Sequence, residues 1–331
     1  MTTARSRRAL DVPALVEQAR EGSPRAVARL ISLVEDASPA LREVMAGLAP
    51  HAGHARVMGL TGSPGVGKST STSALVAAYR RRGMRVGVLA VDPSSPFSGG
   101  ALLGDRVRMQ EHATDPGVFI RSMASRGHLG GLSWATPQAL RVLSAAGCDV
   151  VLVETVGVGQ AEVEVARLAD TTLVLLAPGM GDGIQAAKAG ILEVADVFVV
   201  NKADRDGADT VVRDLRYMLS LGDRRTDSGW RPPIVKTIAA RGEGAGEVLE
   251  EIERHGAWLE ASGQLVARRR ARAADEVEAI ALTALRERMG DLRDGDVLNR
   301  LAADVVAGQT DPYTAADELV AAVTTAGQPP R

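Results

Sequence analysis

The chain has 331 residues, of which 45% are hydrophobic and 24% are charged, and its formal net charge is −2. This composition is typical of a globular protein of one or two domains, and the charge gives no overall attraction to nucleic acid or to an anionic membrane. Cys148 is the only cysteine, which excludes an intrachain disulfide and a cysteine-cluster zinc site. No apolar run approaches the ~18 residues that a membrane span needs, so we expect a cytoplasmic protein without a membrane or nucleic-acid partner.

The first fifty residues favour helices. Asp11, Ser23 and Ser38 each stand one or two residues before a proline, which is the pattern of a capping residue ahead of a first helical turn. An apolar stripe follows, made of Leu30, Ile31, Leu33 and Val34. We therefore expect a helical N-terminal segment over residues 1–54.

From residue 55 to residue 245, short β-rich runs alternate with helix-length segments. Expected strands cover 55–60, 85–91, 118–121, 150–153, 172–176, 197–200 and 234–238. This alternation predicts an α/β domain with a mostly parallel sheet flanked by helices. Helical periodicity returns after Gly246, so we expect a separate C-terminal helical region over residues 246–331.

One ten-residue stretch, residues 61–70, predicts phosphate binding. It follows an apolar run, precedes a helix-compatible run, and contains Thr61, Gly62, Ser63, Pro64, Gly65, Val66, Gly67, Lys68, Ser69 and Thr70. The spacing of its glycines with the Lys-Ser pair is that of a phosphate-binding loop, whose backbone N–H groups converge on phosphate oxygens. Lys68 is expected to neutralise the outer phosphates, and Ser69 to offer its hydroxyl to Mg²⁺. The domain is therefore expected to be a P-loop NTPase.

A second motif selects the base. Asn201, Lys202 and Asp204 follow an apolar strand, and a carboxylate there can accept both the ring N–H and the exocyclic amine of guanine. The loop that contains Ile238, Ala239 and Ala240 is expected to pack on the base, with Ala239 offering a backbone amide. The two motifs together predict GTP and GDP as ligands, rather than ATP.

Acidic residues at strand ends supply the rest of the expected site. Glu154 ends one strand and is assigned either to Mg²⁺ or to the attacking water, with Gly157 three residues later sensing the γ-phosphate. Asp92 ends another strand and is a second candidate for the magnesium shell. Asp105 lies with Arg106 in a Gly/Ser-rich segment that we interpret as a switch closing over the γ-phosphate. The catalytic candidates are thus Lys68, Glu154, Asp105 and Asp92.

Lysine is rare in this arginine-dominated chain. The four lysines are Lys68, Lys188, Lys202 and Lys236, and two of them fall inside the nucleotide motifs. Lys188 follows a second glycine-rich segment, residues 178–185, which itself follows a strand and so is expected on the ligand side of the sheet. Two switch-like segments exceed what simple hydrolysis requires, which suggests that a partner is sensed.

As a set, the motifs of this chain resemble those of the GTPases that accompany adenosylcobalamin-dependent methylmalonyl-CoA mutase. They lie at residues 62–70, 92–95, 154–160, 178–188 and 201–204. These GTPases are relatives of the nickel metallochaperone GTPases, and the resemblance extends to the late segment 311–316. It implies a chaperone that gates cobalamin loading and protects or reactivates an acyl-CoA mutase, with the mutase's adenosyltransferase as a further candidate partner.

The resemblance also implies a homodimer held by the C-terminal helices, and a partner-coupling switch containing Asp182, Gln185 and Lys188. In Ras-type GTPases a water-orienting Gln follows the glycine equivalent to Gly157, but this chain has Val158. We therefore expect slow hydrolysis without a partner.

Two other functions stay open. A nickel-type metallochaperone shares the nucleotide machinery, although the five histidines form no tract and Cys148 is alone. A P-loop ATPase or kinase acting on a transport protein is the other alternative, since members of this family have carried that label.

Overall fold

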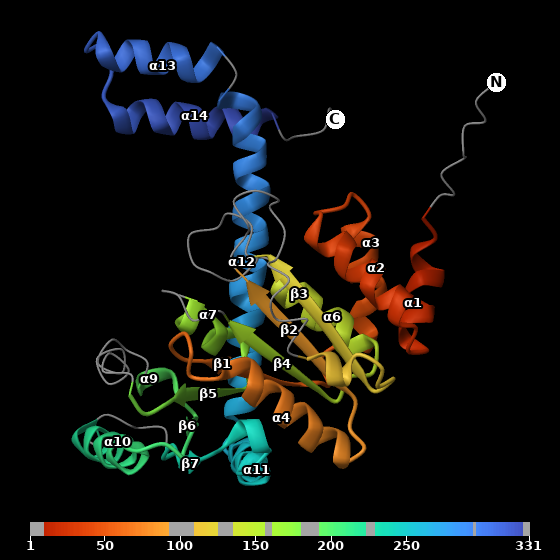
Figure 1. The fold of residues 1–331 in the computed structure, drawn as a ribbon. Coiled ribbons are helices and arrows are strands. Elements are labelled where there is room, and N and C mark those ends of the chain that lie inside the picture. The colour runs from red at the N-terminus through yellow and green to blue at the C-terminus, as the bar shows by residue number, and fades with distance from the viewer. Residues whose placement is uncertain are drawn as a thin grey trace, which may run out of the picture. The chain divides into compact units, whose positions relative to one another are not determined.

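A seven-stranded, entirely parallel sheet forms the centre of the computed structural model (Figure 1). The structure describes residues 10–92, 109–124, 135–155, 161–179, 192–222, 229–293 and 296–326. The strands are β1 (Arg56–Thr61), β2 (Val86–Asp92), β3 (Val118–Ala124), β4 (Val150–Thr155), β5 (Thr171–Leu176), β6 (Val197–Val200) and β7 (Ile234–Lys236). Their order across the sheet is β3-β2-β4-β1-β5-β6-β7.

Helices precede, connect and follow these strands. The N-terminal ones are α1 (Val12–Arg20), α2 (Pro24–Glu35) and α3 (Leu41–Leu48). Those between and directly after the strands are α4 (Lys68–Arg81), η2 (Gln110–His112), α6 (Thr136–Ala145), α7 (Ala161–Leu168), α9 (Leu192–Val194), α10 (Ala208–Gly222), η4 (Ala239–Arg241) and α11 (Ala245–Ala261). The chain continues through α12 (Gln264–Arg293), α13 (Asp296–Val306) and α14 (Pro312–Ala326).

Both faces of the sheet are buried, which explains why its strands are apolar at nearly every position. Successive side chains of a strand point to opposite faces. On β4, Val150 and Leu152 pack in one core with α4 and α11, while Val151 and Val153 pack on the other face, in clusters that contain residues of α6 and α7. The predicted α/β architecture is confirmed.

The N-terminal helices share a core with the sheet. The stripe predicted from the sequence, which includes Leu30 and Ile31, is fully buried and belongs to one cluster with residues of α6 and with Met123 of β3. Arg121 of β3 also donates to Glu35 of α2. Figure 1 shows α1 to α3 grouped beside β3 and α6.

Two of the three expected helix caps form. Asp11 accepts a hydrogen bond from the Ala14 amide and Ser23 accepts one from the Ala26 amide, so each satisfies a free N–H of a first turn. Ser38 instead accepts from the amide of Ala40, and α3 begins at Leu41 without a side-chain cap. The prediction for Ser38 was wrong because its hydroxyl closes a local turn before the helix starts.

A polar cluster lies at the amino-terminal ends of β5 and β6. Asp196, 7% exposed, accepts from the Thr172 amide and from both terminal nitrogens of Arg268. Nε2 of the fully buried His255 lies 3.2 Å from Asp196 Oδ1, which is an ion-pair distance. Burial raises the pKa of Asp196, but the contacts with His255 and Arg268 outweigh it and leave that pKa below its ordinary value.

The chain forms two compact units, Met1–Arg268 and Arg269–Arg331. In the second unit Leu301 and Ala315 are buried, and Asp311 caps α14 by accepting from the amides of Tyr313 and Thr314. None of the helices in the described ranges is both long and apolar enough to cross a membrane. The three-part division at residues 54 and 245 remains a prediction.

Candidate nucleotide-binding site

The glycine-rich loop connects the end of β1 to the start of α4. Gly62 has φ +139° and Gly67 has φ +97°, both in the region that favours glycine. A Cβ on Gly62 would collide with the Leu175 carbonyl oxygen, and one on Gly67 would collide with the side-chain amide of Asn201. These glycines are therefore required both by the backbone turn and by close neighbours.

Lys68 is held inside the loop that precedes it. The side chain is 7% exposed, and Nζ donates to the carbonyls of Gly62 at 2.7 Å and Ser63 at 3.2 Å. An ammonium group fixed at the centre of a backbone loop and at the N-terminus of a 14-residue helix is suited to outer phosphate oxygens.

Glu154, near the carboxyl end of β4, is 4% exposed and lies against the first turns of α4. Its Oε1 accepts from the Ser69 hydroxyl at 2.6 Å, and its Oε2 lies 3.0 Å from the Thr72 hydroxyl. Ser69 and Thr72 stand three positions apart on the helix and so share a face. The carboxylate is thereby fixed in position by two hydroxyls from one helix.

The donor set at Glu154 fits Mg²⁺. A buried carboxylate and a helix hydroxyl are hard oxygen donors of the kind that this ion takes beside nucleotide phosphates. Ser69, expected at the metal, and Glu154, expected either at the metal or at the attacking water, are brought into direct contact. Thr72 was not expected; its position one helical turn after Ser69 was the signal available in the sequence.

Asn201 joins the loop that follows β6 to the glycine-rich loop after β1. Its side chain is buried, and Nδ2 donates to the Val66 carbonyl at 2.9 Å. Its Oδ1 accepts from the Ala239 amide at 3.0 Å and lies 3.2 Å from the Thr237 hydroxyl. One amide therefore connects three segments, from residues 66, 201 and 237–239.

Lys202 makes a second connection of the same kind. Its backbone adopts φ +56°, which is uncommon for a residue with a side chain, and its Nζ donates to the Gly65 carbonyl at 2.6 Å. Two consecutive residues after β6 thus hold the glycine-rich loop, and they fix the distance between that loop and the loop that carries Asp204.

The structure changes the expectation for Ala239. Its amide donates to Asn201, so it is already engaged within the protein. Ile238 pairs with Glu243 in an isolated bridge and Ala240 is an exposed residue of η4. The sequence predicted that this loop packs on the base, which stays a prediction, but it gave no sign that Asn201 would take the Ala239 amide.

Asp204, two residues after Lys202, is exposed. Its Oδ2 is 4.0 Å from a terminal nitrogen of Arg241, whose other terminal nitrogen is 3.9 Å from Glu243. Arg241 belongs to no motif in the sequence, because its approach to Asp204 depends on the turn of η4.

Several expected site residues cannot be placed. Those that lie outside the described residues are Asp105, Arg106, Gly157, Val158, Asp182, Gln185 and Lys188, together with the side chain of Asp92. Their roles stay predictions. Lys236, the remaining unexplained lysine, lies on β7 and pairs with Asp209 at 3.1 Å.

Comparisons with known proteins show the family. A family model described as methylmalonyl-CoA mutase-associated GTPase MeaB matches residues 27–293. A protein of Pyrococcus abyssi named as a GTPase is 47% identical over 308 residues, covering 92% of this chain and 95% of its own. The mouse mitochondrial methylmalonic aciduria type A homolog is 40% identical over 215 residues, covering 64% of this chain and 52% of its own.

A solved structure extends the likeness to the fold. The crystal structure of a LAO/AO transport system kinase superposes with a TM-score of 0.70 at 28% identity, covering 95% of this chain and 97% of that one. One assignment follows from the glycine-rich loop, from the loop that carries Asp204 and from a family model that matches most of the chain. The chain belongs to the MeaB family of methylmalonyl-CoA mutase-associated GTPases, and it is a GTP-hydrolysing enzyme.

Proposed function

We propose that the enzyme uses GTP hydrolysis to gate the loading of a cobalamin cofactor into an adenosylcobalamin-dependent acyl-CoA mutase, and to protect or reactivate that mutase. Methylmalonyl-CoA mutase is the first candidate client, because the matching family is named for its association with this enzyme. The observation that carries the proposal is the double connection from Asn201 and Lys202 to the phosphate-binding loop. Through these contacts, a movement of the phosphate-binding loop on hydrolysis can shift the loop at residues 201–204, and a movement of that loop can shift the phosphate-binding loop.

In the proposed complex, the backbone of residues 61–70 and Lys68 hold the phosphates of GTP, and Asp204 accepts both guanine donors. Since Asn201 engages the Ala239 amide, the base contact from this loop falls to Ala240. Arg241 lies 4.0 Å from one oxygen of Asp204, which places a positive charge beside the carboxylate that guanine needs.

Ser69 and Glu154 would hold Mg²⁺, with Asp92 as a further candidate. When bound, the ion supplies positive charge beside the phosphates and orients their oxygens for attack by water. The two hydroxyl contacts of Glu154 support a role beside Ser69 rather than at the attacking water. Gly157 is proposed to sense the γ-phosphate, with Asp105 closing over it. Without a glutamine at position 158, we expect slow turnover until a partner completes the site.

We propose that Asp182, Gln185 and Lys188 couple the nucleotide state to the mutase, with the adenosyltransferase as a further partner. A homodimer is proposed through the helices after residue 268. Its support is a set of large apolar side chains that are each at least 45% exposed there, namely Val277, Ile280, Leu282, Leu285, Val306, Tyr313 and Val320. Light scattering tests this by measuring the molar mass of the intact protein and of an Ile280→Glu variant. We expect a dimer for the native protein and a smaller mass for the variant, and a monomeric native protein would contradict the proposal.

The function is tested by measuring GTP turnover with and without purified methylmalonyl-CoA mutase. We expect the mutase to accelerate turnover at least tenfold, and GTP to be required for transfer of adenosylcobalamin into the mutase. Lys68→Ala should abolish both effects, because it removes the phosphate contact without touching the partner-coupling residues. Equal turnover with and without this mutase and related acyl-CoA mutases would contradict the proposal.

A kinase acting on a transport protein is the second candidate, favoured by the name of the related crystal structure. The two functions differ in where the γ-phosphate goes. Radiolabelled GTP should release free phosphate under the chaperone proposal, whereas a labelled protein band would support the kinase.

A further inference from the structure

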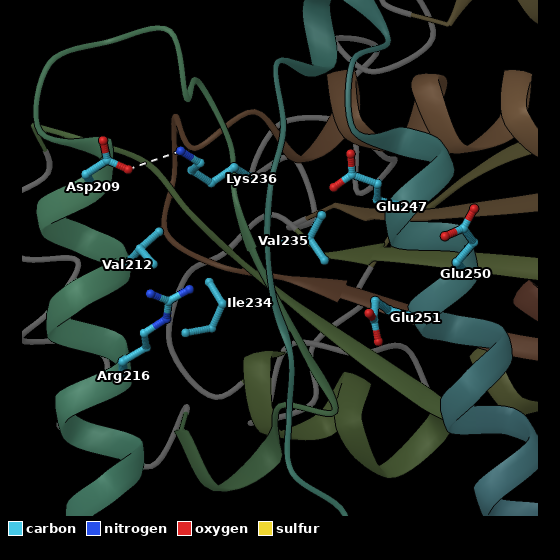
Figure 2. Close-up of a pocket in the computed structure, with 9 residues that line it drawn as sticks. All are labelled: Asp209, Val212, Arg216, Ile234, Val235, Lys236, Glu247, Glu250 and Glu251. Carbon is cyan, nitrogen blue, oxygen red and sulfur yellow. Dashed lines mark hydrogen bonds and ion pairs between the residues drawn. The ribbon is translucent and has the colours of Figure 1, made fainter.

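A groove of about 520 Å³ lies along the β7 edge of the sheet, at the end far from β3 and with no further strand beyond β7 among the residues that the structure describes. Its floor is β7, and helices α10 and α11 form its two walls (Figure 2). Asp209, Val212 and Arg216 face it from α10, at helical spacing. We call this feature the β7 groove. None of its lining residues belongs to the nucleotide site described above.

The floor of the β7 groove offers backbone hydrogen-bonding groups. In the parallel ladder the Pro233 carbonyl accepts from the Phe198 amide and the Thr237 amide donates to the Val200 carbonyl. Bonding to β6 therefore uses residues 233, 235 and 237, and the alternation of a strand directs the N–H and C=O groups of Ile234, and the N–H of Lys236, outward. Unpaired edge groups of this kind are a template for another strand.

The α11 wall is acidic. Glu247, Glu250 and Glu251 line the groove from that helix, and Figure 2 shows Glu247 and Glu251 on the side of α11 that faces β7, with Glu250 on the outer side of the helix. Glu251 shares Oε1 with Arg254 at 2.9 Å, but its Oε2 is buried and accepts no hydrogen bond from any residue that the structure describes. A buried carboxylate oxygen without a donor is unfavourable, so this wall is suited to a ligand that brings N–H donors and positive charge.

The opposite wall adds little positive charge. Lys236 and Asp209 neutralise each other in an exposed pair, and Arg216 is the other basic residue among those that line the groove. The lining side chains carry four acids, Asp209, Glu247, Glu250 and Glu251, against these two bases, which leaves a net charge of −2. An acidic or neutral ligand would gain nothing from such a surface.

We propose that the β7 groove is a docking site for an extended, basic segment of a partner protein, which adds to the sheet beside β7. Its backbone pairs with the outward groups of Ile234 and Lys236, and its Lys or Arg side chains, at alternate positions, reach the glutamates of α11. At about 3.4 Å per residue, the three residues of β7 accommodate a segment of roughly three to four residues.

The test is fluorescence polarisation with a labelled hexapeptide of alternating valine and arginine, titrated with the full-length protein at low salt. Three variants separate its components. The triple substitution Glu247→Gln, Glu250→Gln and Glu251→Gln removes the acidic wall, and we expect about tenfold weaker binding. Ile234→Pro removes one outward N–H without touching the ladder to β6, and we expect about fivefold weaker binding than for Ile234→Ala, which keeps that N–H.

Controls exclude general charge attraction and misfolding. The triple substitution Glu17→Gln, Glu21→Gln and Glu43→Gln removes the same charge from the N-terminal helices and should leave peptide binding unchanged. All variants should keep the native GTP turnover, because none lies in the nucleotide site. The proposal is overturned if the peptide does not bind, if the α11 variant binds it as well as the native protein, or if a backbone N-methylated peptide binds equally.

Discussion

Replacing Asn201 by alanine is the sharpest perturbation of the connection between the two loops of the nucleotide site. The side chain makes one donor contact and two acceptor contacts, with Val66, Ala239 and Thr237. All three partners are buried, between 2% and 8% exposed, so water cannot take the place of the amide without the loops moving apart.

The magnitude follows from the groups left without partners. A buried donor or acceptor that loses its hydrogen bond costs about 1–3 kcal/mol. The Thr237 hydroxyl can rotate to another acceptor, so we count the Val66 carbonyl and the Ala239 amide and expect a loss of about 2–6 kcal/mol. If that loss falls on the arrangement that binds nucleotide, GDP affinity drops by roughly 30- to 20,000-fold.

The assay is equilibrium titration of the full-length protein with a fluorescent GDP analogue, accompanied by thermal unfolding without nucleotide. Asn299→Ala provides a matched control, because that asparagine is exposed on α13. Asn201→Ala should weaken GDP binding far more than the control. An affinity for GDP within threefold of the native value would refute the argument that Asn201 holds the two loops together.

Three further outcomes are expected. Gly62→Ala should abolish nucleotide binding, because φ is +139° and the new Cβ would meet the Leu175 carbonyl; measurable GDP binding would contradict this. Glu154→Gln keeps the side chain's size but not its charge, so the Mg²⁺ concentration that gives half-maximal turnover should rise about tenfold or more; an unchanged Mg²⁺ dependence would favour the water-positioning role instead. Asp196→Asn should reduce stability at neutral pH by about 1–3 kcal/mol, because Arg268, which is about a third exposed, loses the negative charge of its partner. Because the folded-state pKa of Asp196 is lowered, its contribution is present above the unfolded pKa and disappears as pH falls through the folded value, so native and variant unfolding curves should converge in acid.

Most of the sheet could be predicted from the sequence because its strands are buried on both faces and read as apolar runs between turns. The prediction failed only at strand ends and caps, where local hydrogen bonds decide. The expected strand over 234–238 stops at Lys236, because Ile238 turns to pair with Glu243. Ser38 likewise bonds within its own turn instead of capping a helix.

Within the site, the motifs identified residues whose role depends on local sequence, such as Lys68 and Ser69. They could not identify partners set by topology. The contact of Thr72 with Glu154 joins positions 82 residues apart, and the capture of the Ala239 amide by Asn201 joins positions 38 apart. Such pairs arise because parallel strands bring their carboxyl ends to one edge of the sheet, which no local pattern records.

Guanine selection by Asp204 tests the central claim most directly, because it depends on both loops being parts of one nucleotide site. Native protein and Asp204→Asn should be titrated with GDP, ADP and XDP under the same conditions. We expect the native protein to prefer GDP strongly, and the variant to lose GDP affinity and gain XDP affinity, since an amide can donate to the xanthine carbonyl where a carboxylate cannot. Equal binding of ADP and GDP by the native protein, or an unchanged preference in the variant, would contradict the account.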